Sequence, residues 1–438
     1  MNGIGGGLDG IFEIEGANAV FVAPPQVLSK SYLHYSVDAS LYYARSVLLD
    51  AVASTQAPSK EAEDDERKRK RKRKNKKRVY ELNEKEALAE LRHQEARSCI
   101  LNAHEAFRLS SRLLEFRRNC KNKTKIILSC EECHLTTISQ DRDIELDFVK
   151  LAGVWQAPLY KLTLPSKVEE NVVHDLDAEV GEEMQNYSLF NMWIENKRSE
   201  EVIGKVTGFN FLLPKKCRFF ISDIAQIRRL IPDSSSNGYN LLVIDPPWEN
   251  KSVSRRALYP TLPNKQLLRI PLKSLVHLDG ALVALWLTNR QKLHQFVEQE
   301  LFPTWGVKLI TTWYWLKLTT EGELISSLDL THHKPYECLL IGYALQKLPE
   351  ETFAMREDGL KPFIRNVPAG LVALSVPGDH SRKPPLGLLL SQCAPHGSRS
   401  VSCLELFARE LHPGWDSWGN EPLYFQNMKF FRKEISTK

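Results

Sequence analysis

The chain has 438 residues, and its 26% charged and 42% hydrophobic residues are typical of a globular protein with two or three domains. No run approaches the roughly 18 apolar residues of a membrane span, so we expect no membrane partner. The N-terminus has neither a basic region nor a long apolar region, so we also expect no secretory signal and no secreted, disulfide-linked protein.

The net charge of +5 comes from one block of the chain. Residues 67–78, RKRKRKRKNKKR, contain eleven basic residues, and Glu61–Glu66 contains five acids. Removing both blocks takes away eleven positive and five negative charges, which leaves the rest of the chain at −1. Such a basic run favours nuclear import, nucleic-acid contact or both, although a solvated linker has the same composition. We expect a nuclear protein, with the cytoplasm as a second location.

The first half of the chain divides by composition. Residues 1–53 contain aromatic residues and are expected to be partly ordered. Residues 54–78 form a charged linker that cannot bury a core. Residues 79–205 contain apolar side chains at helical spacing, with Asn83 as a plausible cap, and a further helical stretch is expected around 175–194. We predict a smaller, mostly helical N-terminal domain over 79–205.

Residues 206–432 have a different pattern, in which short apolar runs alternate with helical segments such as Asn289–Phe302. Continuous apolar strands that alternate with helices predict an α/β sheet covered on both faces. The predicted strands are Arg218–Ser222, Asn240–Ile244, Leu282–Leu287, Leu309–Lys317, Glu337–Gly342, Leu371–Val376 and Cys403–Phe407.

In such sheets, ligands bind beyond the carboxyl ends of the strands. The residues expected along that rim are Ser222–Ile224, Asp245–Trp248, Thr288–Arg290 and Ala408–Arg409.

The sequence Asp245-Pro246-Pro247-Trp248 follows one predicted strand. Two prolines remove two N–H donors, so the turn offers only acceptors, the Asp245 carboxylate and the Pro246 carbonyl, beside the flat face of Trp248. This set suits a planar group with an –NH₂, such as the exocyclic amine of a nucleobase. Two accepted hydrogen bonds would localise the nitrogen lone pair for attack on a sulfonium methyl group, without a strong general base. The alternative is a rigid turn that only ends the strand.

The wider context resembles a known family. VIDPPWENKSVSRR is similar to the active-site segment of the DPPW-type (MT-A70-like) adenine N6-methyltransferases. FFISDIAQ, ALWLTNRQ, HHKPYECLLIG, SRKPPL and LELFARELHPGWDSWGNE also resemble this family, and in detail its methyltransferase-like protein 4 branch. The resemblance covers about 209–425. It implies a Rossmann-like fold with permuted motif order that depends on S-adenosyl-L-methionine (SAM).

The resemblance also implies roles for particular residues. Asp245, Pro246, Pro247 and Trp248 would be catalytic. The residues that would bind the cofactor are Ser222, Asp223, Ile224, Asp245, Lys334, Arg409, His412, Asn420 and Glu421. The residues that would contact the nucleic acid are Asn250, Lys251, Arg255, Arg256 and Tyr259.

The branch implies N6 methylation of an internal 2′-O-methyladenosine in U2 small nuclear RNA, with DNA adenine as a second substrate. Two alternatives stay open: a nucleic-acid-binding subunit with an inactive site, and methylation of cytosine N4 or of a protein amine. The sequence leaves the oligomeric state open and is compatible with a monomer. Cys130, Cys133 and His134 match a haem-attachment or zinc pattern, but without a second cysteine pair we expect reduced thiols and no metal.

Overall fold

The computed structural model describes residues 10–43, 84–117, 173–175, 189–206, 209–233, 237–249, 262–330, 334–345, 366–379, 382–395 and 401–434. The basic run, the charged linker, the Cys130–His134 motif and the predicted nucleic-acid contacts from Asn250 to Tyr259 lie outside these residues.

One twelve-stranded sheet forms the centre of the molecule. Its strands are, in spatial order, β1 (Ile11–Ile14), β2 (Ala19–Val22), β13 (Val372–Ser375), β11 (Val307–Lys317), β12 (Tyr336–Ala344), β10 (Ala281–Leu287), β9 (Leu241–Ile244), β14 (Cys403–Leu406), β15 (Trp415–Gly419), β8 (Arg218–Ile221), β5 (Trp193–Glu195) and β4 (Val173–Asp175). The strands β10, β9, β14, β15 and β8 are parallel, so their carboxyl ends lie along one edge.

The sheet is covered on both faces, as the sequence predicts. All seven residues of β10 are buried, and alternate residues enter two different apolar clusters. Val283 and Leu285 belong to one cluster, whereas Leu282 and Trp286 belong to the other. This explains why β10 is a continuous apolar run instead of an alternating one. The α/β, Rossmann-like fold class is confirmed.

The seven predicted strands correspond to β8 through β14, with ends that shift by one or two residues. The predicted helix over 289–302 is a continuous helical stretch of α10 (Gln291–Phe296), the π-helical η5 (Val297–Leu301) and α11 (Phe302–Trp305). It ends at Gly306, whose φ of 70° lies in the left-handed region that glycine tolerates. The sequence analysis missed β15, because Asp416, Ser417 and Gly419 interrupt its apolar run. Pairing with β14 and β8 makes it a strand.

The N-terminal half does not form a separate helical domain in the part of the chain that the structure describes. Strands β1 and β2 extend the central sheet next to β13, and β5 pairs with β8 at the other end. The hairpin of β6 (Val202–Val206) and β7 (Phe209–Leu213) spans the predicted boundary at 205/206. Most of the helix expected around 175–194 falls on residues 176–188, which lie outside the described residues; its two ends are strands, β4 and β5.

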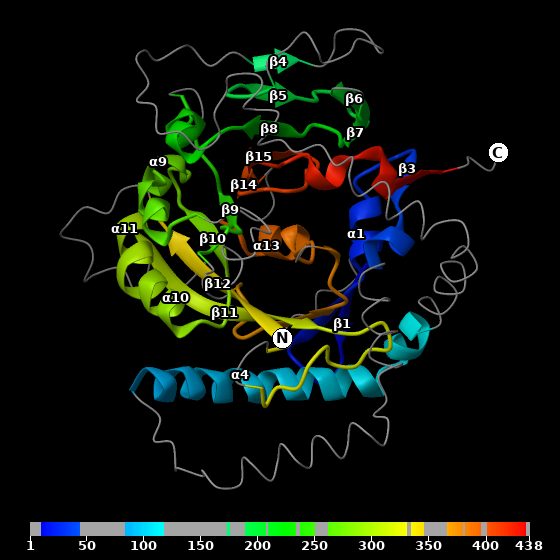
Figure 1. The fold of residues 1–438 in the computed structure, drawn as a ribbon, viewed down its shortest axis with the longest axis vertical. Helices are drawn as coiled ribbons and strands as arrows, with labels where there is room; N and C mark the ends of the chain where they lie inside the picture. The colour runs from blue at the N-terminus through cyan, green and yellow to red at the C-terminus, as the bar shows by residue number, and fades with distance from the viewer. Residues whose placement is uncertain are drawn as a thin grey trace, which may run out of the picture.

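The long helix α4 (Glu84–Leu109) is the helical part of that region, and it runs along the β1 end of the sheet (Figure 1). Its buried residues recur every three or four positions, at Ala96, Ile100, Ala103 and Phe107, and this stripe faces the sheet domain. Phe107 stacks on Phe21 of β2 with ring centroids 5.0 Å apart. The helix therefore packs on the same core as the strands.

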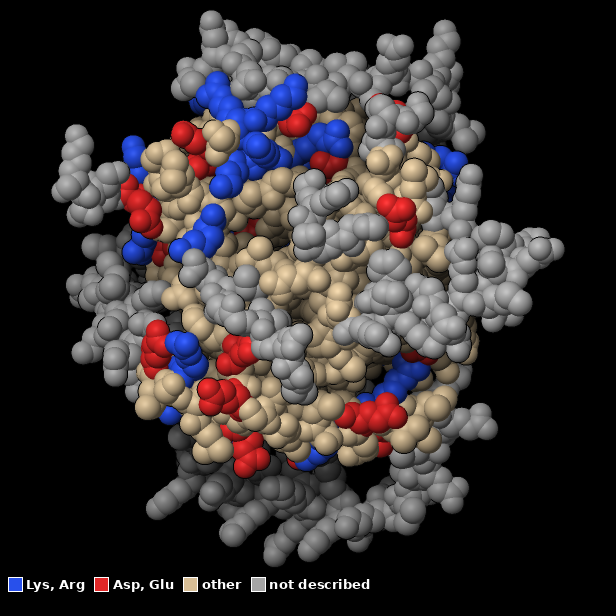
Figure 2. Space-filling view, turned by 180° about the vertical axis from the view of Figure 1, so that it is seen from behind, with Lys and Arg blue, Asp and Glu red and all other residues tan. Residues whose placement is uncertain are grey.

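Short elements complete the fold. They are α1 (Pro24–Ser29), β3 (Tyr35–Val37), η3 (Ile224–Leu230), η4 (Asn264–Arg269), α9 (Leu272–Leu275), α13 (Gly387–Cys393), η8 (Tyr424–Gln426), η9 (Met428–Phe430) and β16 (Phe431–Lys433). Among the described helices, none has the length and apolarity to cross a membrane. Seen from behind, Lys and Arg side chains gather at the upper end of the molecule, and acidic side chains are more frequent at the lower end (Figure 2).

Candidate active site

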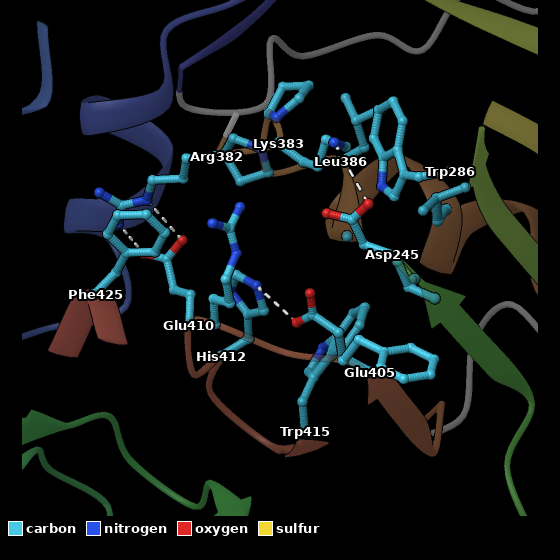
Figure 3. Close-up of a pocket in the computed structure, with 17 residues that line it drawn as sticks. Asp245, Trp286, Arg382, Lys383, Leu386, Glu405, Glu410, His412, Trp415 and Phe425 are labelled. Carbon is cyan, nitrogen blue, oxygen red and sulfur yellow. Dashed lines mark hydrogen bonds and ion pairs between the residues drawn. The ribbon is translucent and has the colours of Figure 1, made fainter. Parts of the chain in front are cut away.

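A cavity of about 640 Å³, including its open mouth, lies between the carboxyl ends of β9 and β14 and helix α13 (Figure 3). The polar and aromatic residues that line it are Asp245, Trp286, Arg382, Lys383, Glu405, Phe407, Arg409, Glu410, His412, Trp415 and Phe425.

The DPPW turn begins where β9 ends. The Asp245 N–H donates to the Leu406 carbonyl at 3.3 Å, so the turn stays attached to the neighbouring strand β14. The Pro246 carbonyl accepts the Trp248 N–H at 2.8 Å, and one of its two lone pairs remains for another donor. The Asp245 carboxylate lines the cavity, as the sequence predicts for an acceptor site.

Trp248 is packed differently from the sequence-based expectation. Its side chain belongs to the apolar core, and the residue is only 9% exposed. Its indole N–H donates to the Trp286 carbonyl at 2.9 Å. The expected open face for stacking a base is therefore absent here, and Trp248 anchors the turn against β10.

Four charged side chains of alternating sign form a row that begins at the turn: Asp245, Lys383, Glu337 and Lys317. The Lys383 ammonium lies 3.4 Å from Asp245 and 3.0 Å from Glu337, and Lys317 lies 2.5 Å from the other Glu337 oxygen. Burial alone would lower the pKa of Lys383, but Asp245 and Glu337 outweigh it and raise this pKa. Burial alone would raise the pKa of Glu337, but Lys383 and Lys317 lower it to about 2. Glu337 and Lys383 are therefore both ionised at neutral pH.

The lysine that lines this cavity is Lys383 and not Lys334, the lysine that the sequence predicted as a cofactor contact. Lys334 does not line the cavity, and its charged neighbours are Glu90 and Arg97 of α4, together with Asp329. Burial, with a contribution from Arg97, lowers the pKa of Lys334. The motif SRKPPL contained the correct lysine, since its two prolines follow Lys383 directly and stiffen the segment that presents it.

Glu405 is a second cavity residue that the sequence analysis did not select. It lies within β14, and its Oε2 is buried without a hydrogen-bond partner among the described residues. His412 Nε2 is 3.6 Å from that oxygen. Burial, with repulsion from Glu410 and Asp245, raises the pKa of Glu405 to about 8, and burial lowers the pKa of His412. An acid within a central strand between Leu404 and Leu406 was the available signal, because such positions are normally apolar.

Arg409 and His412 both line the cavity, as predicted. Phe407, between β14 and Arg409, has a φ of 62°, in a region that non-glycine residues seldom adopt. This backbone turn redirects the chain after β14 and sends Arg409 toward Phe425, whose ring centroid is 5.4 Å from the guanidinium carbon. Strained backbone of this kind often occurs at functional sites.

The other predicted cofactor residues lie further along the same edge, at the ends of β8 and β15. The Ser222 N–H donates to the Gly419 carbonyl at 3.2 Å, which brings Ser222–Ile224 next to Asn420 and Glu421. The Asp223 carboxylate accepts the Ala225 N–H at 2.7 Å and caps η3, and burial raises its pKa. Ser222 accepts from the Trp418 indole at 2.8 Å, which gives its hydroxyl a structural partner. None of these residues lines the cavity itself.

The rim expected at Thr288–Arg290 adjoins the turn on its other side. Thr288 has a buried hydroxyl without a hydrogen-bond partner among the described residues. The Arg290 guanidinium donates to the Glu249 carbonyl at 3.2 Å, directly after Trp248. Within the described ranges, no three His, Cys, Asp or Glu side chains are placed to hold a metal ion.

Comparison with known proteins agrees with this geometry. The MT-A70 family signature matches residues 239–421. The chain is 43% identical to the N(6)-adenine-specific methyltransferase METTL4 of Mus musculus over 244 residues, 56% of this chain and 50% of that protein. It is 35% identical to the N6-methyladenosine RNA methyltransferase MTA1 of Pyricularia oryzae over 229 residues, 50% of this chain and 56% of that protein.

A relative from Caenorhabditis elegans, a DNA N6-methyl methyltransferase, is 30% identical over 274 residues, 62% of this chain and 69% of that protein. The matched part of the chain spans about half the length of the mouse and fungal relatives. The family signature includes Asp245, Lys383 and Glu405. The family predicted from the DPPW context is thus confirmed, and the chain belongs to the MT-A70 family of methyltransferases.

Proposed function

We propose that this protein transfers a methyl group from SAM to the exocyclic N6 amine of adenine in a nucleic acid. The observation that carries the proposal is the position of Asp245. Its carboxylate faces the cavity at the end of β9, and the Lys383 ammonium lies 3.4 Å away. The Pro246 carbonyl directly follows in the same turn. A carboxylate and a carbonyl side by side can accept both hydrogens of one amine.

The cavity residues fit SAM by their chemistry. The methionine part of SAM carries a carboxylate and an ammonium group, and its sulfur is a cation. Lys383 and Arg409 are cations that would hold the carboxylate, and Asp245 and Glu405 are acids that would face the positive groups. The Oε2 of Glu405, which has no hydrogen-bond partner among the described residues, could accept from such a donor. Asp223, Asn420 and Glu421 lie further along the same edge, where they would hold the adenosine part.

The residues of the turn would act by position and charge. Bound SAM would supply the methyl group as an electrophile. Asp245 and Pro246 would accept the two amine hydrogens and direct the nitrogen lone pair toward the cavity. The Lys383 ammonium keeps Asp245 in place, and Trp248 keeps the turn attached to β10. No residue needs to remove a proton first, because the nitrogen becomes acidic only after it gains the methyl group.

We further propose an internal 2′-O-methyladenosine of U2 small nuclear RNA as the substrate, with DNA adenine as a second substrate. The sequence resemblance to the methyltransferase-like protein 4 branch suggests the first, and the similarity to the RNA methyltransferase MTA1 supports RNA as its class. The similarity to the C. elegans DNA methyltransferase supports the second. The predicted contacts at Asn250, Lys251, Arg255, Arg256 and Tyr259 would meet the nucleic acid. The basic run at 67–78 supports a nuclear location.

In the experiment, the purified chain is incubated with labelled SAM and with matched RNA and DNA oligonucleotides. The oligonucleotides are made with and without a 2′-O-methyl group on the target adenosine. Digestion and mass spectrometry then identify the methylated nucleoside. N6-methylated adenosine is the expected product. Label on cytosine or on protein would reject adenine as the target. If no oligonucleotide became labelled, the result would favour a binding subunit with an inactive site.

A further inference from the structure

The segment that presents Lys383 is held at its neighbour, Arg382. Arg382 is only 4% exposed, and its guanidinium makes two hydrogen bonds to the Glu410 carboxylate. The guanidinium carbon lies 4.2 Å from the Phe425 ring centroid and 4.8 Å from the Tyr42 ring centroid. Since the next residue is Lys383, whose ammonium meets Asp245, the orientation of Arg382 determines where that lysine can reach.

Tyr42 contacts the same segment at a second point. A Cβ added to Gly378 would lie 2.9–3.2 Å from the Tyr42 ring and hydroxyl, so the ring lies directly against the Gly378 backbone. Tyr42 therefore touches the segment both before and at Arg382. It is buried, and its hydroxyl has no hydrogen-bond partner in the part of the chain that the structure describes. The contact of Tyr42 with Arg382 is made by its ring.

Tyr42 comes from the N-terminal segment, here residues 10–43, which the chain anchors at several points. Strand β2 pairs with β13, and β3 pairs with β16. Tyr42 lies in helical residues that directly follow Asp38, whose carbonyl accepts the Tyr42 N–H at 2.9 Å. Asp38 in turn accepts from Arg432 at 2.5 Å, close to the C-terminal end of the described chain. These contacts hold the backbone at Tyr42 in place.

We propose that the N-terminal segment is part of the catalytic unit, and that Tyr42 is a positioning residue for Lys383. The ring of Tyr42 holds Arg382 and Gly378, and these hold the Lys383 ammonium against Asp245. This inference rests on the proposed function, because the affected site is the one that would bind SAM. The family signature begins only at residue 239, so it does not include this segment.

The test compares Tyr42→Leu, Tyr42→Phe and Ile11→Ala in the full chain. Ile11 is buried in β1 of the same segment and lies in a different apolar cluster from Tyr42, so Ile11→Ala loosens the segment elsewhere. The measurements are thermal unfolding, SAM affinity by titration calorimetry, and KM for SAM and kcat with an adenine-containing oligonucleotide.

Tyr42→Leu should weaken SAM binding about tenfold, from the loss of a buried cation–π contact, and should raise KM for SAM more than it lowers kcat. Tyr42→Phe should rescue the affinity, because it keeps the ring. Ile11→Ala should lower the unfolding temperature without a comparable change in KM.

Equal SAM affinity in wild type and folded Tyr42→Leu would overturn the positioning role and leave the proposed function intact. An equal loss of SAM affinity in Ile11→Ala and Tyr42→Leu would mean that Tyr42 acts only through the stability of the segment. This result would also overturn the positioning role. A wild-type chain that binds no SAM would instead overturn the proposed function.

Discussion

Asp245→Asn isolates the chemistry of the turn. The substitution preserves size, removes a charge and turns one acceptor oxygen into an NH₂ donor, which faces a donor on the substrate. A misplaced donor at a reaction centre should slow the chemical step by about 10²–10³, by comparison with the loss of an oxyanion-hole donor. Substrate binding should change far less, because the rest of the cavity is untouched.

The structure also bounds the effect of Asp245→Asn on folding. At 3.4 Å, the attraction between Lys383 and Asp245 is roughly 5 kcal/mol in an environment of effective dielectric constant 20, before desolvation is subtracted. Lys383 keeps Glu337 at 3.0 Å, so it is not left buried without a counter-charge. We therefore expect a loss of about 1–2 kcal/mol in the free energy of unfolding, which a well-folded chain tolerates.

The assay is single-turnover methylation of an adenine-containing oligonucleotide at saturating SAM, with SAM affinity measured separately. Saturation is needed because Asp245 also faces the cavity. Asp329→Asn is the matched control, since Asp329 forms an exposed ion pair with Arg97 outside the cavity, and its rate should equal that of the wild type. A near-wild-type rate for Asp245→Asn would refute the proposed mechanism and leave DPPW as a rigid turn.

Three further changes test other parts of the site. Lys383→Met should weaken SAM binding by tenfold or more, and Lys334→Met should not. If calorimetry finds the reverse, Lys334 is the cofactor-binding lysine, as the sequence predicted. Because the folded pKa of Glu405 is raised to about 8, its carboxyl is protonated in the folded chain and ionised in the unfolded chain between about pH 4.5 and 8. Stability in urea should therefore fall as pH rises through this window, by at most about 1.4 kcal/mol per pH unit, and a Glu405→Gln chain with the same slope would contradict the assignment. Deleting residues 67–78 should move the protein from nucleus to cytoplasm and flatten the salt dependence of nucleic-acid binding; unchanged imaging and salt titrations would identify a passive linker.

The central strands could be predicted because their signal is local. A strand buried on both faces needs continuous apolar residues, and β8 through β14 show this in the sequence itself. The same reasoning placed Asp245 at a strand end, and the two prolines restricted its turn to acceptors. The SRKPPL and LELFAR motifs also marked the right segments, although not every functional side chain within them.

Tertiary structure alone decided which distant residues meet. Lys334 and Lys383 look alike in sequence, but only the path of the segment after β13 brings a lysine to Asp245. The pKa of Glu405 is raised only because β14 lies in the middle of the sheet, where its carboxylate is largely shielded from water. The N-terminal segment gave no strand signal. Its strand β2 forms because β13 offers an edge to pair with, and β1 then pairs with β2. Hydrophobic periodicity reports how a residue is buried, whereas strand order determines what lies beside it.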